Sequence, residues 1–181
     1  MRVISGSARG LKLNSPEGDK TRPTLDRVKE AVFSMLFPYL NGADVLDLFA
    51  GTGALGIEAL SRGADKACFI DNSKEAIRII NSNVSAAKFV DSSAIIQKDA
   101  VEFLKNCDRG FDIIFIDPPY ANGLYEIVLE SISKNKILNK NGLIVIEKDM
   151  DLGPVDLFND SFEVFKEKKY GRVGITVLKW R

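Results

Sequence analysis

The stretch Asp47-Leu-Phe-Ala-Gly51-Thr-Gly53-Ala-Leu-Gly56 joins the end of an apolar run to the start of a segment with helical spacing. Glycines let the backbone turn sharply and approach a ligand, and the following helix presents free N–H groups. The spacing also satisfies G-x-G-x-x-G, so the glycines alone leave a dinucleotide possible. Asp47 favours a cofactor with an amino-acid end, because its carboxylate can accept from an ammonium but would lie poorly beside a pyrophosphate. The alternative is a tight strand-to-helix turn without a ligand.

Outward from this turn, short apolar runs alternate with segments of helical period. The runs are typical of strands buried on both faces, and their alternation with helices predicts a doubly wound, mostly parallel sheet. Two strand-like segments near the end predict an antiparallel hairpin, and a small β-hairpin is expected near the start. Expected strands are 45–49, 67–70, 94–96, 113–116, 143–146, 162–166 and 173–180, and expected helices are 55–62, 74–88, 101–107 and 125–135.

Length and composition limit the number of domains, the compartment and the kinds of catalysis that the chain can support. With 181 residues, 45% of them hydrophobic, it can bury one core, so we expect one domain over 1–181, with a hairpin extension (1–20) and a catalytic core (21–181). The net charge is zero, although basic residues gather near both ends. The two cysteines lie far apart, and the absence of histidine excludes His-based catalysis and nearly all catalytic zinc sites. No metal is therefore expected. No apolar run is long enough to span a membrane or direct export, so a cytoplasmic protein is expected.

Acidic residues follow two further predicted strands. Asp71 is placed to accept hydrogen bonds from ribose hydroxyls, with a helix cap as the alternative. Asp99 could accept from an adenine amino group, or it could cap the helix that begins at Ala100. Because the carboxyl ends of parallel strands line one crevice, Asp71 and Asp99 together predict a ligand site more strongly than either residue alone.

Asp117-Pro118-Pro119-Tyr120 closes the apolar run 111–116. The two prolines fix φ and remove two backbone donors, which leaves carbonyl acceptors at a rigid turn. The Asp117 carboxylate and the Pro118 carbonyl can each take a hydrogen of an exocyclic amine, and Tyr120 can stack on the base. The pattern therefore predicts methyl transfer to a nucleobase amine, whereas the alternative is a turn that merely ends a buried strand.

Taken in order, these motifs resemble the class I S-adenosylmethionine-dependent methyltransferases that act on nucleobase amino groups. More narrowly, segments 1–10, 22–30 and 47–60 resemble the bacterial RsmD family. The likeness covers almost the whole chain and is strongest over 1–120. It implies a Rossmann-like fold, S-adenosylmethionine as cofactor, and methylation of N2 of one guanine in small-subunit (16S) ribosomal RNA as a step of rRNA processing. It also implies a substrate within a ribosomal particle; a monomer is our default expectation.

The candidate site residues fall into three groups. Basic residues near the start could bind RNA phosphates around a splayed nucleotide, although a solvated helix face and a charged hairpin are the alternative. The expected catalytic residues are Asp117, Pro118, Pro119 and Tyr120; the expected cofactor contacts are Asp47, Phe49, Gly51, Gly53, Gly56, Asp71, Asn72, Asp99 and Ala100; and the expected RNA contacts are Arg9, Arg22 and Arg27.

Two other functions stay open from the residues themselves. The same acceptor geometry serves the N6 amine of adenine in DNA or RNA. A non-catalytic dinucleotide- or nucleoside-binding protein could be built on the same glycine turn.

Overall fold

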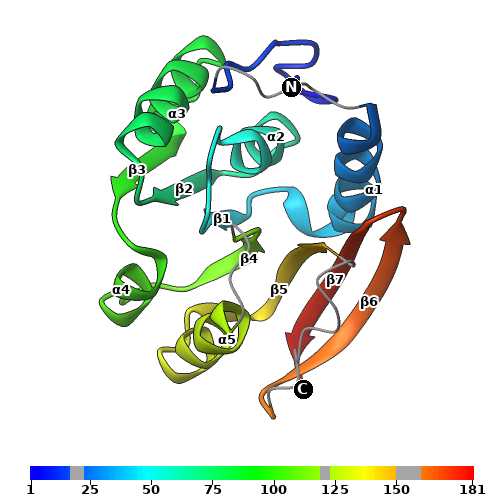
Figure 1. The fold of residues 1–181 in the computed structure, drawn as a ribbon, viewed down its shortest axis with the longest axis vertical. Helices are drawn as coiled ribbons and strands as arrows, with labels where there is room; N and C mark the ends of the chain where they lie inside the picture. Colours follow the sequence, from blue (N-terminus) through cyan, green and yellow to red (C-terminus); the bar gives the residue numbers. More distant parts are fainter. Residues whose placement is uncertain (17–22, 119–122, 150–159) are drawn as a thin grey trace.

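The computed structural model describes residues 1–16, 23–118, 123–149 and 160–181 (Figure 1). Strands and helices alternate from the first strand onward, as the sequence predicts. The elements are α1 (Pro23–Leu40), β1 (Asp44–Asp47), α2 (Ala54–Ser61), β2 (Lys66–Asp71), α3 (Lys74–Ala86), the 3₁₀ turn η1 (Val90–Ser92), β3 (Ser93–Gln97), α4 (Ala100–Lys105), β4 (Phe111–Ile116), α5 (Leu124–Lys134), β5 (Leu138–Asp149), β6 (Phe162–Tyr170) and β7 (Val173–Trp180).

The strands form one seven-stranded sheet in the order β3-β2-β1-β4-β5-β7-β6. Strands β1 to β5 pair in parallel, whereas β7 runs antiparallel to both β5 and β6. This confirms the predicted doubly wound sheet with an antiparallel C-terminal hairpin. The strand order reverses between β1 and β4, and ligands of such sheets bind outside the carboxyl ends of the strands at this switch point. Asp47 and Asp117 both lie there.

Helices cover both faces of the sheet, so the strands are apolar on both sides. Helices α1, α2 and α3 pack on one face, and α4 and α5 on the other (Figure 1). Successive strand residues alternate between the two cores: in β1, Val45 belongs to the first and Leu46 to the second. Phe33 of α1 contacts Phe115 of β4, with ring centroids 5.7 Å apart.

The N-terminal segment forms the expected small hairpin, although its only bridge within the described residues joins Arg2 and Lys12. The N–H of Val3 donates to the carbonyl of Leu11 at 2.9 Å, and Val3 is buried in the first core. In Figure 1 this segment lies above α2 and beside one end of α3. Among the described residues, no helix is both long and apolar enough to cross a membrane.

Candidate active site

A cavity of about 170 Å³ opens at the carboxyl ends of the central strands. It lies between α1, the glycine turn and the ends of β1, β4 and β5. Four residues predicted from the sequence line it: Asp47, Phe49, Gly51 and Asp117. The other lining residues are Met1, Asp26, Val28, Lys29, Val32, Ala50, Thr52, Ala54, Leu55 and Glu147.

The glycine turn has the geometry that its sequence predicts. Gly51 and Gly53 have φ values of +55° and +77°, a region that side-chain-bearing residues rarely adopt. Gly56 serves packing instead, because a Cβ at that position would lie 2.3 Å from Cε1 of Phe69 in β2. Gly53 and Gly56 therefore shape the turn without lining the cavity. Only Gly51 of the three reaches it.

Asp47 is a buried carboxylate held by the first turn of α2. Its Oδ2 accepts a hydrogen bond from the Gly56 N–H at 3.0 Å, and its exposed fraction is 2%. Burial raises the pKa of Asp47 to about 7, the Gly56 hydrogen bond opposes this, and the charges of Asp117 and Asp71 add to it. A cation bound beside Asp47 would relieve this penalty.

Asp71 and Asp99 hold backbone groups in place and do not line this cavity. Asp71 Oδ2 accepts from the Gly51 N–H at 2.9 Å, so it fixes the glycine turn. The cap of α3 is Ser73, not Asp71, because the Ser73 hydroxyl accepts from the Ala76 N–H. Asp99 does cap α4, accepting from the N–H of Glu102 at 2.9 Å. Contacts of these acids, and of their neighbours Asn72 and Ala100, with a cofactor stay predictions.

Asp117 stands at the end of β4 on the cavity floor. Its side chain keeps a face open to the cavity, whereas surrounding protein atoms displace much of its hydration and raise the pKa of its carboxyl to about 6. Pro118, the next residue, is buried. Pro119 and Tyr120 lie outside the described residues, so the stacking of Tyr120 on the base stays a prediction.

Glu147, near the end of β5, was not predicted as a site residue. It lines the cavity with Asp47 and Asp117, and burial together with the charge of Asp117 raises its pKa to about 8. The sequence did carry a signal: Glu147 follows an apolar run just as Asp47 and Asp117 do, but belongs to no recognised motif. Within the described residues, no cluster of three or more acidic or thiol side chains has the geometry of a metal site.

The family model described as Conserved hypothetical protein 95 matches residues 1–179. The chain belongs to this family. Proteins named Ribosomal RNA small subunit methyltransferase D are 36% identical in Haemophilus influenzae, over 96% of this chain and 90% of that protein, and 34% identical in Escherichia coli K12, over 96% and 86%. These relatives confirm the resemblance to the RsmD methyltransferases.

Solved structures agree with the family membership. An Escherichia coli protein superposes with a TM-score of 0.89 at 30% identity, covering 100% of this chain and 98% of that chain. A methylase from Haemophilus influenzae superposes with a TM-score of 0.82 at 34% identity, covering 98% and 96%. A more distant structure, 18% identical and with a TM-score of 0.69 over 88% of this chain and 50% of that chain, shares the fold and was solved in complex with S-adenosylhomocysteine.

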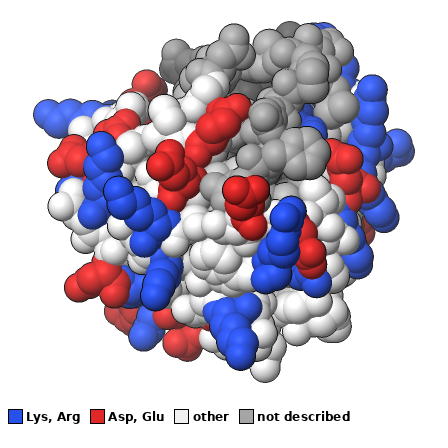
Figure 2. Space-filling model, turned by 90° about the horizontal axis from the view of Figure 1, so that it is seen from below, with Lys and Arg blue, Asp and Glu red and all other residues white. Residues whose placement is uncertain are grey.

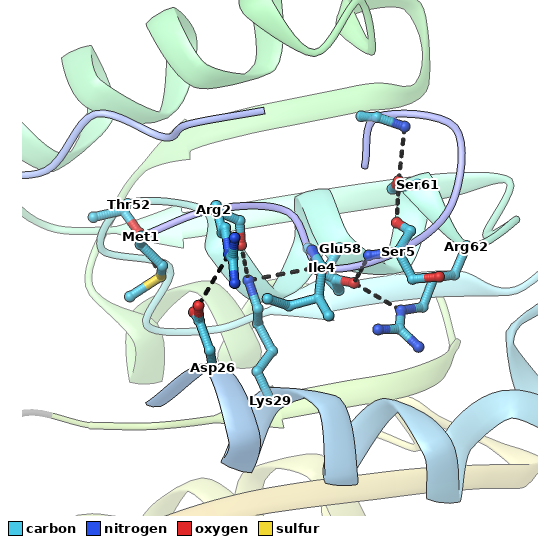
Figure 3. A network of polar contacts seen from close by, with 12 residues as sticks. Met1, Arg2, Ile4, Ser5, Asp26, Lys29, Thr52, Glu58, Ser61 and Arg62 are labelled. Carbon is cyan, nitrogen blue, oxygen red and sulfur yellow. Dashed lines mark hydrogen bonds and ion pairs between the residues drawn. The ribbon is translucent and has the colours of Figure 1, made fainter. Parts of the chain in front are cut away.

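In this family member, a buried polar network fixes the N-terminal segment beside the cavity (Figure 3). Glu58 of α2 is fully buried and accepts from the backbone N–H groups of Ile4 and Ser5 at 2.8 and 3.0 Å. Its carboxylate pairs with Lys29 of α1 at 3.2 Å and with Arg62 at 2.7 Å. The Lys29 ammonium also donates to the Arg2 carbonyl.

A second anchor joins the same segment to the glycine turn. The buried Asn83 of α3 donates to the carbonyls of Asn14 and Thr52, at 3.0 and 2.9 Å. Thr52 in turn contacts the sulfur of Met1 at 4.0 Å. The start of the chain therefore forms part of the cavity wall, which the sequence alone did not indicate.

The basic residues predicted to contact RNA occupy exposed positions where they are described. Arg9 lies in the N-terminal hairpin and Arg27 on α1, while Arg22 lies outside the described residues. Figure 2 shows basic and acidic side chains interspersed over one face, without a broad field of one sign. This face matches the zero net charge of the chain.

Proposed function

We propose that the protein transfers the methyl group of S-adenosylmethionine to the exocyclic N2 of a guanine in small-subunit ribosomal RNA. The observation that supports this is that Asp117 and Asp47 line the same cavity at the switch point of the sheet. The names of the curated relatives supply the substrate class.

The residues fit the proposed cofactor. The Asp47 carboxylate is buried without a cationic partner among the described residues, which suits the ammonium of an amino-acid end. The Gly51 turn brings backbone against the cavity, and the aromatic ring of Phe49 lines it. The distant neighbour in complex with S-adenosylhomocysteine supports the same cofactor. When bound, S-adenosylmethionine supplies an electrophilic methyl group on a positively charged sulfur.

The roles proposed for Asp117 and Pro118 follow from the chemistry of the aromatic amine that receives the methyl group. Its lone pair is delocalised into the base, so the nitrogen is a poor nucleophile. The Asp117 carboxylate and the Pro118 carbonyl each accept one amine hydrogen, which favours a pyramidal nitrogen with its lone pair directed at the methyl carbon. With the amine so held, its lone pair would form the new N–C bond as the methyl–sulfur bond breaks with its electrons on sulfur, and Asp117 or water would take the surplus amine proton. Alignment alone can lower such a barrier by about 7–11 kcal/mol.

The RNA substrate is proposed to be held by Arg9, Arg22 and Arg27, which can contact phosphates around a nucleotide turned out of its stack. A small protein without net positive charge has little electrostatic attraction for free RNA of its own. This favours a ribosomal particle as the substrate.

The experiment is methyl transfer from labelled S-adenosylmethionine to small-subunit particles and to stripped RNA, followed by mass spectrometry of the nucleosides. N2-methylguanosine should appear, more strongly from particles. Methyladenine would replace this proposal with the N6 alternative, and no transfer together with tight NAD binding would favour the non-catalytic alternative.

The site assignment is tested with Asp117→Ala, which should abolish transfer while calorimetry shows S-adenosylmethionine still bound. Asp91→Ala is the matched control, because Asp91 in η1 is exposed and does not line the cavity. Unchanged turnover of Asp117→Ala would refute the role of this carboxylate.

A further inference from the structure

We infer that Glu147 determines the base specificity of this site: its carboxylate accepts the N1–H of guanine while Asp117 accepts the neighbouring N2 amine. This inference rests on the proposed function and names a residue that neither the motifs nor the comparisons assign. It explains how the acceptor site can distinguish guanine from adenine, which the Asp117-Pro118 pair cannot do.

Strand register places the two carboxylates side by side. Ile116 of β4 pairs with Ile146 of β5 in parallel register, so Asp117 and Glu147 are the next residues on adjacent strands. Both line the same cavity. Adjacent acceptors at the end of two parallel strands match adjacent donors along one edge of a base. Guanine presents N1–H and the N2 amine next to each other, whereas adenine presents its amine beside a ring nitrogen that carries a lone pair.

The surroundings of Asp117 and Glu147 favour a base edge that carries hydrogen-bond donors. Within the described residues, neither carboxylate receives a hydrogen bond, and each lies close enough to the other to raise the cost of ionising both. The neighbouring cations are already engaged: Lys148 pairs with Glu167 at 3.0 Å, and Lys29 pairs with Glu58. Above about pH 8, where both groups are ionised, a guanine edge supplies hydrogens to both of them, while the lone pair of adenine N1 would face an acceptor.

The backbone of Glu147 is held firmly, as a specificity residue requires. Strand β5 pairs with β4 on one side and with β7 on the other, where Glu147 is in register with Ile175. In addition, the Tyr125 hydroxyl of α5 donates to the Glu147 carbonyl at 3.0 Å. The side chain therefore projects into the cavity from an interior strand, not from a loop.

The test compares guanine with 2,6-diaminopurine, which keeps the N2 amine but has a lone pair in place of N1–H. Each is placed at the mapped acceptor position of small-subunit RNA assembled into particles. At pH 8.5, above the Glu147 pKa of about 8, wild-type protein should prefer guanine in kcat/KM by about 10- to 100-fold, the range of one well-placed base contact. Glu147→Gln should reduce this preference to less than about threefold, because an amide can either accept from N1–H or donate to the lone pair.

Glu75→Gln is the control, since Glu75 is exposed on α3 and does not line the cavity; it should keep the wild-type preference. An unchanged preference in Glu147→Gln overturns the inference. If that variant is inactive on both bases, Glu147→Asp decides: a retained guanine preference at reduced kcat/KM supports the inference, and a lost preference overturns it. Failure of wild-type protein to form N2-methylguanosine would instead refute the proposed function, before any variant is compared.

Discussion

The network around Glu58 and three acids of the cavity, Asp47, Asp117 and Glu147, both hold carboxylates within the protein, but they differ in how the charge is balanced. Glu58 and Asp47 are fully buried, whereas Asp117 and Glu147 keep part of the side chain open to the cavity. Glu58 contacts two cationic side chains and two backbone N–H groups. In the cavity, Asp47 accepts one backbone N–H, and Asp117 and Glu147 accept none from the described residues. The pKa values of Asp47, Asp117 and Glu147 are raised, mainly by burial.

The difference distinguishes a carboxylate that holds the fold together from carboxylates that are available to bind a ligand. A buried ion whose lone pairs are all satisfied holds segments together, and here it joins residues 1–16 to α1 and α2. Buried acids without partners cost free energy, and such groups cluster where a ligand supplies the missing charge or hydrogen. The cavity acids are therefore expected to bind ligand groups, and the Glu58 network to keep the wall of the cavity in place.

The largest expected effect comes from breaking the satisfied network. Glu58→Ala should lower the free energy of unfolding by about 3–5 kcal/mol, because it leaves Lys29 and Arg62 without their counterion and two backbone donors unpaired. Glu147→Ala, which also removes one carboxylate, should change the free energy of unfolding by less than about 1 kcal/mol. Urea denaturation of both variants without cofactor measures the contrast, and equal losses would remove the distinction between the two regions.

The next effect concerns Asp47 and depends on pH. Its folded-state pKa of about 7 lies above the ordinary value of 3.8, so its contribution to stability is full below pH 4 and is lost as pH rises through 7. Asp47→Asn should therefore be more stable than wild type by on the order of 2 kcal/mol at pH 8.5, with the gain vanishing near pH 4. Denaturation at pH 4.5, 7 and 8.5 tests the sign.

The same substitution should weaken S-adenosylmethionine binding, since the amide carries no charge for the ammonium. Calorimetry at pH 8.5 measures this loss. A variant that is both less stable and equally tight in binding would show that Asp47 is a structural residue like Glu58.

A smaller effect is expected from two glycines of the N-terminal hairpin, which share a left-handed backbone but differ in contacts. Gly6 has φ of +88°, and an added Cβ would lie 1.7 Å from the Ser61 carbonyl oxygen; Gly10 has φ of +85°, with nothing within 4 Å. Gly10→Ala should cost about 1–2 kcal/mol of backbone strain, and Gly6→Ala somewhat more because the segment must also leave α2.

Hydrogen exchange distinguishes strain from detachment. The Ser7 and Ala8 N–H groups donate to the backbone carbonyl and the hydroxyl of Ser61, at 2.8 and 2.9 Å. These amides should lose protection in Gly6→Ala and keep it in Gly10→Ala. Equal protection in both variants would mean that the segment docks independently of the close contact at Gly6.

The two regions also differ in how far the sequence predicts them. The sheet and the positions of Asp47 and Asp117 followed from apolar runs and the glycine turn, because strand ends in a parallel sheet share one edge. The roles of Asp71 and Asp99 were harder to predict, since an acid after a strand can bind either a ligand or backbone N–H groups. In the structure, both accept from the backbone.

The Glu58 network could not be predicted, because its partners at Ile4 and Ser5 lie 54 and 53 residues away along the chain. Within a helical segment, a glutamate beside an arginine four residues later looks like an ordinary surface pair. Only the packing of residues 1–16 over α2 buries it. Glu147 had the same strand-end signal as Asp117, and only the register of β4 with β5 shows that they are neighbours.

The smallest expected effect lies at the edge of the network, where Arg2 pairs with Asp26 at 3.2 Å. The Arg2 side chain is 64% exposed, and the network uses only the backbone carbonyl of this residue. Arg2→Ala should therefore lower the free energy of unfolding by about 0–1 kcal/mol, and the loss should shrink further in high salt. Urea denaturation at low and high salt tests this. A salt-independent loss of several kcal/mol would instead show that the Arg2 guanidinium belongs to the buried Glu58 network and is not a solvent-exposed side chain at its edge.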